Sequence, residues 1–481
     1  MQICNAVDGC NDVRANRRVI ASWASVSGHG IFFAIAVLLL PISIVYADTA
    51  LPVQPGSDDV VLYRGATVIN GDTPQVRMDV LVSGERIQQV APEGQIGADI
   101  LAKSRVVDLH GRYLIPGLID SHVHLATPPN RRQAEALLRR DLYGGVTAVR
   151  DMADDLRALG DIARASLVGE MPGADVYYAA LMAGPAFFAD KRTAMVSAGA
   201  TAGQVPWMQA VTEKTDLSLA VANAHGTYAT AIKLYADLDA DLVRKITAEA
   251  HRQGMLVWAH ATLYPAKPSE VVAAGVDAIS HACLLVREPD AHLGPLSEPR
   301  SKVDLDQFRA GKSAALAPVF AEMVRRGTIL DATIWTYGPP PPGPTSAPPL
   351  APGSCDADVG GAITGQAYRA GVQIAAGTDN VAPWTDPWPD LFHELSDLHS
   401  RAGMPPVAVL RSATQVSARA AGQERDMGSI EPGKLANMVV LKDDPLATLD
   451  NLKSVVMTIK RGRVFERKDF VPLTDGDIVD F

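Results

Sequence analysis

The chain has 481 residues, of which 47% are hydrophobic and 20% are charged, and its formal net charge at pH 7 is -10. This length suffices for a large barrel with an appended domain, and the composition is that of an ordinary globular protein. An acidic chain of this kind has no electrostatic footprint for nucleic acid or anionic lipid, so we expect a small-molecule partner and no nucleic acid.

The first 47 residues have the pattern of a targeting segment. Arg14, Arg17 and Arg18 precede the apolar run 31–40, and Ala47 supplies a small residue at a cleavage position. We expect a signal peptide over 1–47 and an exported protein, periplasmic or extracellular. The alternative is an uncleaved membrane anchor, although the apolar run is short for a span.

Cysteine usage agrees with export. Cys4 and Cys10 lie in the expected signal, which leaves Cys283 and Cys355 in the mature chain. Both are expected on adjacent barrel loops, so we predict that they form one disulfide bridge, which an exported protein permits.

Short strands separated by glycine turns come next, at 60–63, 76–82 and 86–90. The same pattern returns near the C-terminus, at 438–441, 455–459 and 463–465. Two such sets that flank a long middle region predict one small β-sandwich domain built from both chain ends, residues 48–113 and 426–481.

The middle region, 114–425, alternates apolar runs with amphipathic helical segments such as 240–252 and 269–274. The opening stretch 115–125 and seven later runs are strand candidates, at 146–149, 175–179, 231–235, 256–259, 278–280, 329–333 and 372–376. This alternation predicts an α/β fold, a (β/α)8 TIM-like barrel, whose functional residues lie at the carboxyl ends of the strands.

Histidines and one aspartate fall at those strand ends. His122 and His124 are separated by one residue, so on a strand both point to the same side, as two ligands of a divalent metal would. His260 ends the fifth strand, His281 the sixth, and Asp379 follows the eighth. Lys233 lies inside the fourth strand, where an unpaired ammonium is costly. We expect solvated or structural roles for the other seven histidines.

These residues, in this order, resemble the metal-dependent amidohydrolase superfamily, and most closely its imidazolonepropionase-like and prolidase-like members. The segment 428–437, Gly-Ser-Ile-Glu-Pro-Gly-Lys-Leu-Ala-Asn, adds to the resemblance, with Asn437 where many relatives have aspartate. The resemblance extends over nearly all of the expected mature chain.

The resemblance implies a binuclear site with two divalent metal ions, expected to be zinc. His122, His124 and Asp379 would hold one ion and His260 and His281 the other, with a carbon dioxide-derived carbamate on Lys233 as the bridge. A shared hydroxide would attack the scissile carbonyl, and Asp379 would move its proton to the leaving amine. The alternative for Lys233 is a surface or ion-paired lysine beside a single metal.

The substrate is less well indicated. Tyr235, two residues beyond Lys233, either hydrogen-bonds the substrate as a catalytic group or packs in the barrel. Arg150, at the end of strand two, either grips a substrate carboxylate or pairs with Asp151. Aromatic residues on later loops suit an apolar substrate or a homo-oligomer contact: Phe187, Phe188, Trp384 and Trp388. The proline-rich segment Pro339–Pro352 is expected to form a stiff lid or surface excursion.

We therefore predict a metal-dependent hydrolase of a C–N bond, amide or peptide-like, in a small molecule. A lactone or ester hydrolase with the same site is one alternative. A catalytically silent scaffold that retains the barrel is the other.

Overall fold

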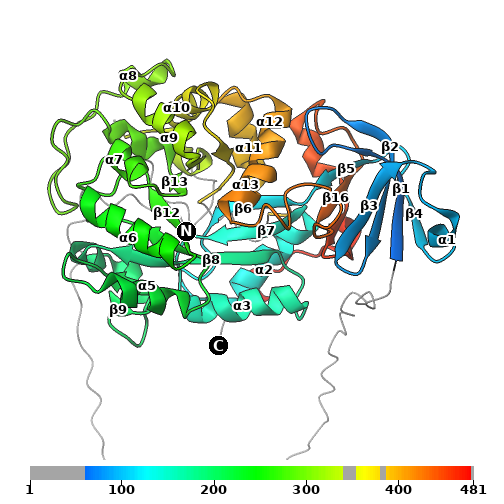
Figure 1. The fold of residues 1–481 in the computed structure, drawn as a ribbon, viewed down its shortest axis with the longest axis horizontal. Coiled ribbons are helices and arrows are strands. Elements are labelled where there is room, and N and C mark those ends of the chain that lie inside the picture. Colours follow the sequence, from blue (N-terminus) through cyan, green and yellow to red (C-terminus); the bar gives the residue numbers. More distant parts are fainter. Residues whose placement is uncertain (1–59, 340–353, 380–385, 478–481) are drawn as a thin grey trace, which may run out of the picture. The chain divides into compact units, whose positions relative to one another are not determined.

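A computed structural model describes residues 60–339, 354–379 and 386–477 (Figure 1). The expected signal segment, Trp384 and residues 340–353 of the proline-rich segment lie outside the described residues. None of the helices in the described ranges has both the length and the apolar character needed to cross a membrane.

Eight parallel strands form a nearly closed barrel, as predicted. Neighbouring strands pair in chain order, and the first and last meet where Ser121 N donates to Ala376 O at 2.8 Å. The strands are β6 (Leu118–Val123), β7 (Val146–Asp151), β8 (Asp175–Ala183), β11 (Ala231–Leu234), β12 (Leu256–His260), β13 (Ala278–Ser280), β14 (Ile329–Asp331) and β15 (Ile374–Ala375). Two short strands extend this sheet beside β8, namely β9 (Gln204–Val205) and β10 (Met208–Ala210).

Helices alternate with these strands and bury one apolar face each. In α6 (Ala240–Arg252), which matches the expected segment, Leu242, Val243 and Ile246 are buried at helical spacing, and the Asp239 carboxylate caps the first turn. The remaining helices are α1 (Ala98–Leu101), α2 (Arg131–Tyr143), α3 (Leu156–Val168), α4 (Lys191–Val196), α5 (Leu217–His225), α7 (Pro268–Ala273), α8 (Asp306–Arg309), α9 (Ala317–Arg326), α10 (Ala357–Arg369), α11 (Leu391–Ser400), α12 (Pro406–Ser412) and α13 (Gln415–Ala420). The 3-10 helices are η1 (Pro185–Ala189), η2 (Ala282–Arg287), η3 (Trp335–Tyr337), η4 (Leu449–Lys453), η5 (Arg467–Asp469) and η6 (Asp475–Asp477).

A mixed sheet combines strands from both ends of the chain, consistent with the predicted β-sandwich. Its order is β18-β17-β16-β5-β1-β2-β3, with β4 also paired to β1. The first half of β1 pairs with β4 and the second half with β5, so the sheet divides there. In Figure 1 the blue N-terminal strands and the red C-terminal strands lie side by side where β5 meets β16. The strands are β1 (Val60–Val68), β2 (Gln75–Ser83), β3 (Arg86–Pro92), β4 (Arg105–Asp108), β5 (Tyr113–Pro116), β16 (Met438–Leu441), β17 (Val455–Lys460) and β18 (Arg463–Glu466).

The stretch 115–125, expected as one strand, is divided between the two sheets at Gly117. Strand β5 ends at Pro116 in the mixed sheet, and β6 begins at Leu118 in the barrel. A Cβ atom on Gly117 would lie 2.2 Å from Thr147 Oγ1, so the chain can pass from sheet to barrel here only without a side chain. The expected domain boundary after residue 113 falls inside β5.

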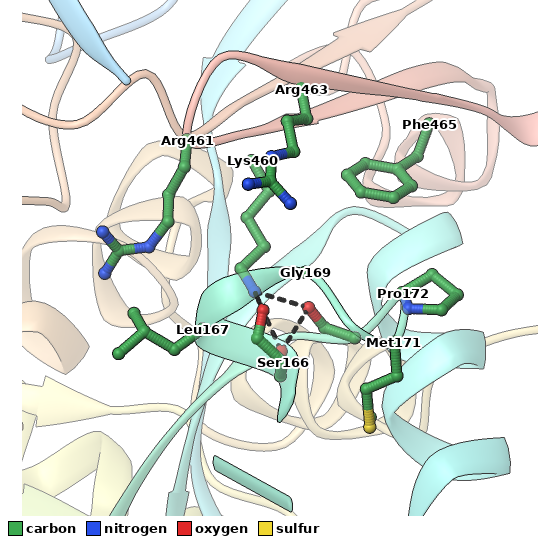
Figure 2. Close-up of a pocket in the computed structure, with 10 residues that line it drawn as sticks. Ser166, Leu167, Gly169, Met171, Pro172, Lys460, Arg461, Arg463 and Phe465 are labelled. Atoms are coloured by element: carbon green, nitrogen blue, oxygen red, sulfur yellow. Dashed lines mark hydrogen bonds between the residues drawn. The ribbon is translucent and has the colours of Figure 1, made fainter. Parts of the chain in front are cut away.

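A buried lysine joins the mixed sheet to the barrel (Figure 2). Lys460 ends β17, and its Nζ donates to Ser166 O at 3.1 Å, Ser166 Oγ at 2.9 Å and Gly173 O at 2.8 Å. It also pairs at 2.7 Å with Asp175, the first residue of β8. Arg461 Nε donates to the same carboxylate at 2.9 Å. The junction thus lies at the amino end of the barrel strands.

Candidate metal centre

Two imidazoles and one carboxylate converge at the carboxyl end of the barrel. The Nε2 atoms of His122 and His124 lie 3.4 and 3.5 Å from Asp379 Oδ1. The backbone N of Asp379 donates to His122 O at 2.9 Å, which fixes the loop after β15 beside β6. The two histidines therefore share one side of their strand, as their spacing predicted.

Each of these two imidazole rings is also held by a further carboxylate, on the side that faces away from Asp379. His122 Nδ1 lies 2.7 Å from Asp331 Oδ2, and His124 Nδ1 lies 2.8 Å from Asp154 Oδ1. Such outer partners fix the tautomer, so that the Nε2 lone pair is directed at the centre. By spacing alone, Asp151 could share a metal ion with His124 and Asp154. However, Asp151 Oδ2 accepts a hydrogen bond from the backbone N of Leu125 at 2.8 Å and so holds the loop after β6.

The remaining predicted ligands complete the same cluster. The ring of His281 lies 4.8 Å from that of His122 and 4.6 Å from that of His260, centroid to centroid. Tyr235 O lies 3.1 Å from His260 Nδ1, and Thr333 Oγ1 lies 2.9 Å from His281 Nδ1. The fully buried Lys233 donates from Nζ to Ser280 Oγ at 3.1 Å. The four predicted histidine ligands and Asp379 thus lie in one cluster, and Lys233 is bonded to Ser280, the residue before His281.

The backbone is strained at two of these residues. His281 has a φ of 75° and Asp379 a φ of 48°, both in the left-handed region that non-glycine residues rarely adopt. Strain of this kind persists where the surroundings over-determine a side chain's position, which is common at functional sites.

The donor set fits a divalent cation. Ligand atoms at about 2.1 Å from a tetrahedral ion lie about 3.4 Å apart, close to the spacing of both Nε2 atoms from Asp379 Oδ1. That oxygen is buried and, within the described residues, has no hydrogen-bond donor. A carboxylate oxygen left unbonded in a buried site is costly unless a cation meets it.

Burial sets the protonation of most of the cluster. It lowers the pKa of His122, moves that of His281 to about 3 and holds that of His260 well below its usual value, so these rings are neutral. Burial likewise lowers the pKa of Lys233 to about 7. Neutral imidazoles are the form that binds metals.

His124 differs, because a carboxylate lies on each side of it. Burial works against the cation, yet Asp154 and then Asp379 raise its pKa to about 10. Burial alone would raise the pKa of Asp379, but the imidazoles of His122 and His281 hold it below its usual range. The centre is therefore one that favours positive charge, which a divalent ion supplies in place of the proton on His124.

Arg150 does not have the role considered for it. It is fully buried inside the barrel, where it donates to Ser121 O at 2.7 Å and Asp331 Oδ2 at 3.2 Å. Its guanidinium lies 4.5 Å from the Trp258 ring centroid. A substrate carboxylate cannot reach it, and its partner is Asp331, not Asp151. Sequence reasoning missed both aspartates that hold the candidate ligand rings, Asp331 and Asp154. For Asp331, the last residue of β14, its place at a strand end was a usable signal.

Tyr235 lies at the edge of the cluster. Its ring is 4.0 Å from that of His260 and 4.4 Å from that of Phe187, and Arg192 Cζ lies 5.8 Å from its centroid. Trp388 instead packs under Arg467, 4.0 Å away, near the end of the chain. The other described histidines lie outside the cluster; for example, His251 pairs with Asp277 at 2.9 Å.

The predicted disulfide is present. Cys283, two residues after His281, is bonded to Cys355 just before α10, with Cα atoms 5.7 Å apart. The bridge therefore closes the long segment after strand six against the loop that follows strand seven.

Comparison with known proteins identifies the family. The model for the amidohydrolase family matches residues 113–465. The chain therefore belongs to the amidohydrolase family. A segment of 94 residues is 32% identical to D-hydantoinase of Streptomyces coelicolor; it covers 19% of this chain and 20% of that enzyme, so the match spans about a fifth of the relative's length.

Solved structures share the fold. One is the A. niger ochratoxinase, at 20% identity and a TM-score of 0.66, with 87% of this chain and 98% of that chain covered. Another is a Xaa-Pro dipeptidase with bound methionine, at 20% identity and a TM-score of 0.64, with 85% of this chain and all of that chain covered.

Proposed function

We propose that this chain is a metal-dependent hydrolase that cleaves a C–N bond, amide or peptide-like, in a small molecule bearing a carboxylate near that bond. The observation that carries the proposal is the convergence of two Nε2 atoms on an otherwise unbonded carboxylate oxygen of Asp379. Family membership and the names of the matched proteins, a hydantoinase and a dipeptidase, support the reaction class.

The centre would hold two divalent ions, most simply zinc. His122, His124 and Asp379 would hold one, and His260 and His281 the other. Lys233 would bridge them after its neutral amine takes up carbon dioxide, and a pKa near 7 favours that neutral form. Bound metal supplies Lewis acidity and a nucleophile derived from water at neutral pH. Asp379, between the imidazoles, is placed to accept a proton and return it to a leaving amine.

Arg192 supports a carboxylate-bearing substrate. Its side chain is 29% exposed, and it lies against Tyr235, which in turn contacts His260. Asp190 engages its Nη2 at 2.6 Å and also its Nε, which fixes the guanidinium. A fixed guanidinium one aromatic ring away from a candidate metal ligand is suited to bind a substrate carboxylate, as in an N-acyl amino acid or dipeptide. Phe187 would cover an adjoining apolar group.

A substrate panel tests this function. N-acyl amino acids, dipeptides, their C-terminal amides, and lactones would be assayed with the zinc-loaded enzyme. We expect turnover of the free carboxylates, and a fall of about 10–100-fold in kcat/KM for Arg192→Gln.

Arg157→Gln is the matched control. Arg157 makes the same contact with the capping Asp155, at 2.7 Å, but lies over Trp207 and not over Tyr235. Its removal should leave kcat/KM unchanged. Turnover of lactones alone, or of the amides as fast as of the acids, would contradict the proposal.

We also propose export from the cytoplasm, which the disulfide supports because such bridges persist in oxidising compartments. Exported material should begin at Asp48 by mass spectrometry. Protein that retains residues 31–44 in the membrane fraction would instead indicate an anchor.

A further inference from the structure

The segment after strand seven contacts three of the candidate ligands without being one of them. We call residues 331–337 the strand-seven turn. It supplies a partner to His122, to His281 and to Asp379: Asp331 Oδ2 at 2.7 Å from His122 Nδ1, Thr333 Oγ1 at 2.9 Å from His281 Nδ1, and Thr336 Oγ1, which donates to Asp379 O at 3.2 Å. A shift of this turn would therefore move ligands of both proposed ions.

The turn does not adopt its conformation unaided. Thr333 has a φ of 47°, a value that is unfavourable for a β-branched residue. The 3-10 helix η3 then starts with backbone N–H groups that need acceptors from outside it. Something beyond the turn must hold this conformation in place.

Glu394 of α11 provides that support. Its side chain is fully buried, and its Oε2 accepts the backbone N of Trp335 at 2.8 Å. The backbone of Ile334, the residue before, also favours the charged form of this carboxyl and lowers its pKa. The preceding residue, His393, stacks on the Trp335 ring with centroids 4.7 Å apart. Two neighbouring residues of α11 therefore contact both the backbone and the side chain of Trp335.

A carboxyl group in this place is costly. Burial raises the pKa of Glu394 well above its usual range, and its Oε1 has no hydrogen-bond partner among the described residues. Leucine or glutamine would fill the space at lower cost, but leucine would leave the backbone N–H of Trp335 without an acceptor. The acceptor oxygen, and not the charge, is what the turn requires.

We propose that Glu394 is a positioning residue: it anchors the strand-seven turn, which in turn aims His122, His281 and Asp379 at the metal centre. The inference rests on the proposed function, since it assumes that these residues bind metal.

Zinc affinity, measured by competition with a chromophoric chelator, tests the proposal directly. Glu394→Gln retains an acceptor oxygen and should bind zinc as the wild type does. Glu394→Asp withdraws the oxygen by one methylene, and Glu394→Ala removes it; both should weaken zinc binding by about 10–100-fold, as expected for loss of an outer partner. Kinetics of the loaded enzyme should show the same order, with the loss in kcat and not in KM.

Asp79 offers a matched control far from the centre. It is also buried and accepts two backbone N–H groups, those of Gly65 and Gly94, each at 3.1 Å. Asp79→Ala should lower the urea midpoint of unfolding without changing zinc affinity. Equal zinc affinity in the Asp and Gln variants of Glu394 would overturn the proposal, even if the Ala variant does not fold, as would an equal loss in Asp79→Ala. If the wild-type protein binds no divalent metal, it is the proposed function that fails.

Discussion

The two ends of the barrel treat buried lysines in opposite ways. At the amino end, Lys460 meets four oxygen atoms, one of them from Asp175. Toward the carboxyl end, Lys233 has a single hydrogen bond among the described residues, to Ser280. Burial lowers the pKa of both amines. A lysine whose amine has all its hydrogen bonds made can hold two parts of a fold together. A lysine whose amine has few partners remains available for chemistry.

The same contrast extends to the carboxylates. Asp277, at the amino end of β13, accepts Val257 N at 2.7 Å and meets His251 at 2.9 Å. Asp379, at the carboxyl end, leaves Oδ1 without a donor in the described part of the chain and has a strained backbone. The charged groups compared at the amino end are matched by partners, whereas Lys233 and Asp379 retain unmet bonding capacity.

The largest expected effect comes from Lys233. Lys233→Ala should lose most bound metal and reduce turnover by on the order of 10³-fold or more, with the fold retained, because the bridge would be lost. Metal content and near-ultraviolet circular dichroism measure the two halves of this prediction. A short carboxylic acid added to the variant should restore part of the activity, whereas Lys233→Arg should remain inactive because a guanidinium stays cationic. If Lys233→Ala retained two bound metals and near-normal rates, Lys233 would have no bridging role and the contrast with Lys460 would fail.

The disulfide between Cys283 and Cys355 adds a covalent constraint near the carboxyl end of the barrel. Its sequence separation of 72 residues corresponds to about 4 kcal/mol in the chain-entropy treatment. The double variant Cys283→Ser, Cys355→Ser should lose an amount of this order in urea unfolding. Reductant should destabilise the wild type equally and leave the double variant unchanged; a wild type insensitive to reductant would contradict the prediction.

Removing Lys460 should lower the stability of the fold and leave the metal content unchanged. Lys460→Met leaves three oxygen acceptors and part of the Asp175 charge unmatched, at a cost of about 3 kcal/mol in the free energy of unfolding. Lys453→Met, at an exposed position of η4, is the control and should have little effect. Zinc content of folded Lys460→Met should match the wild type. Metal loss there would mean that the two ends of the barrel are coupled.

The smallest effect concerns the surface pair of His251. The hydrogen bond that His251 donates to Asp277 raises the pKa of His251 above its usual value. A raised folded-state pKa gives stability that is fully present below the unfolded pKa, about 6.5, and is lost as pH rises through the folded value. Since the side chain is 41% exposed, we expect only about 0.5 kcal/mol. His251→Gln should be less stable than the wild type near pH 5.5 and equal to it near pH 9, by urea unfolding; a constant difference would exclude the ion pair as its cause.

Much of this architecture could be predicted from the sequence, because buried parallel strands are continuous apolar runs and their carboxyl ends carry the ligands. His122 and His124 needed only their spacing. Arg150 could not be assigned, because its partners Ser121 and Asp331 approach it only in the closed barrel. Asp331 had only its place at a strand end as a signal, and Glu394 looks like an ordinary acidic residue until the fold brings it to the strand-seven turn.

The pairing of β5 with β16 means that β5 is synthesised long before its partner strand. Pro116 and Met438, aligned partners in this pairing, are separated by more than three hundred residues. At about 10 residues per second, the N-terminal strands wait on the order of 30 s with an unpaired edge. That edge is open to pairing with another molecule. Chains truncated before β16 should therefore aggregate through Tyr113–Pro116, even though every candidate metal ligand has already been made.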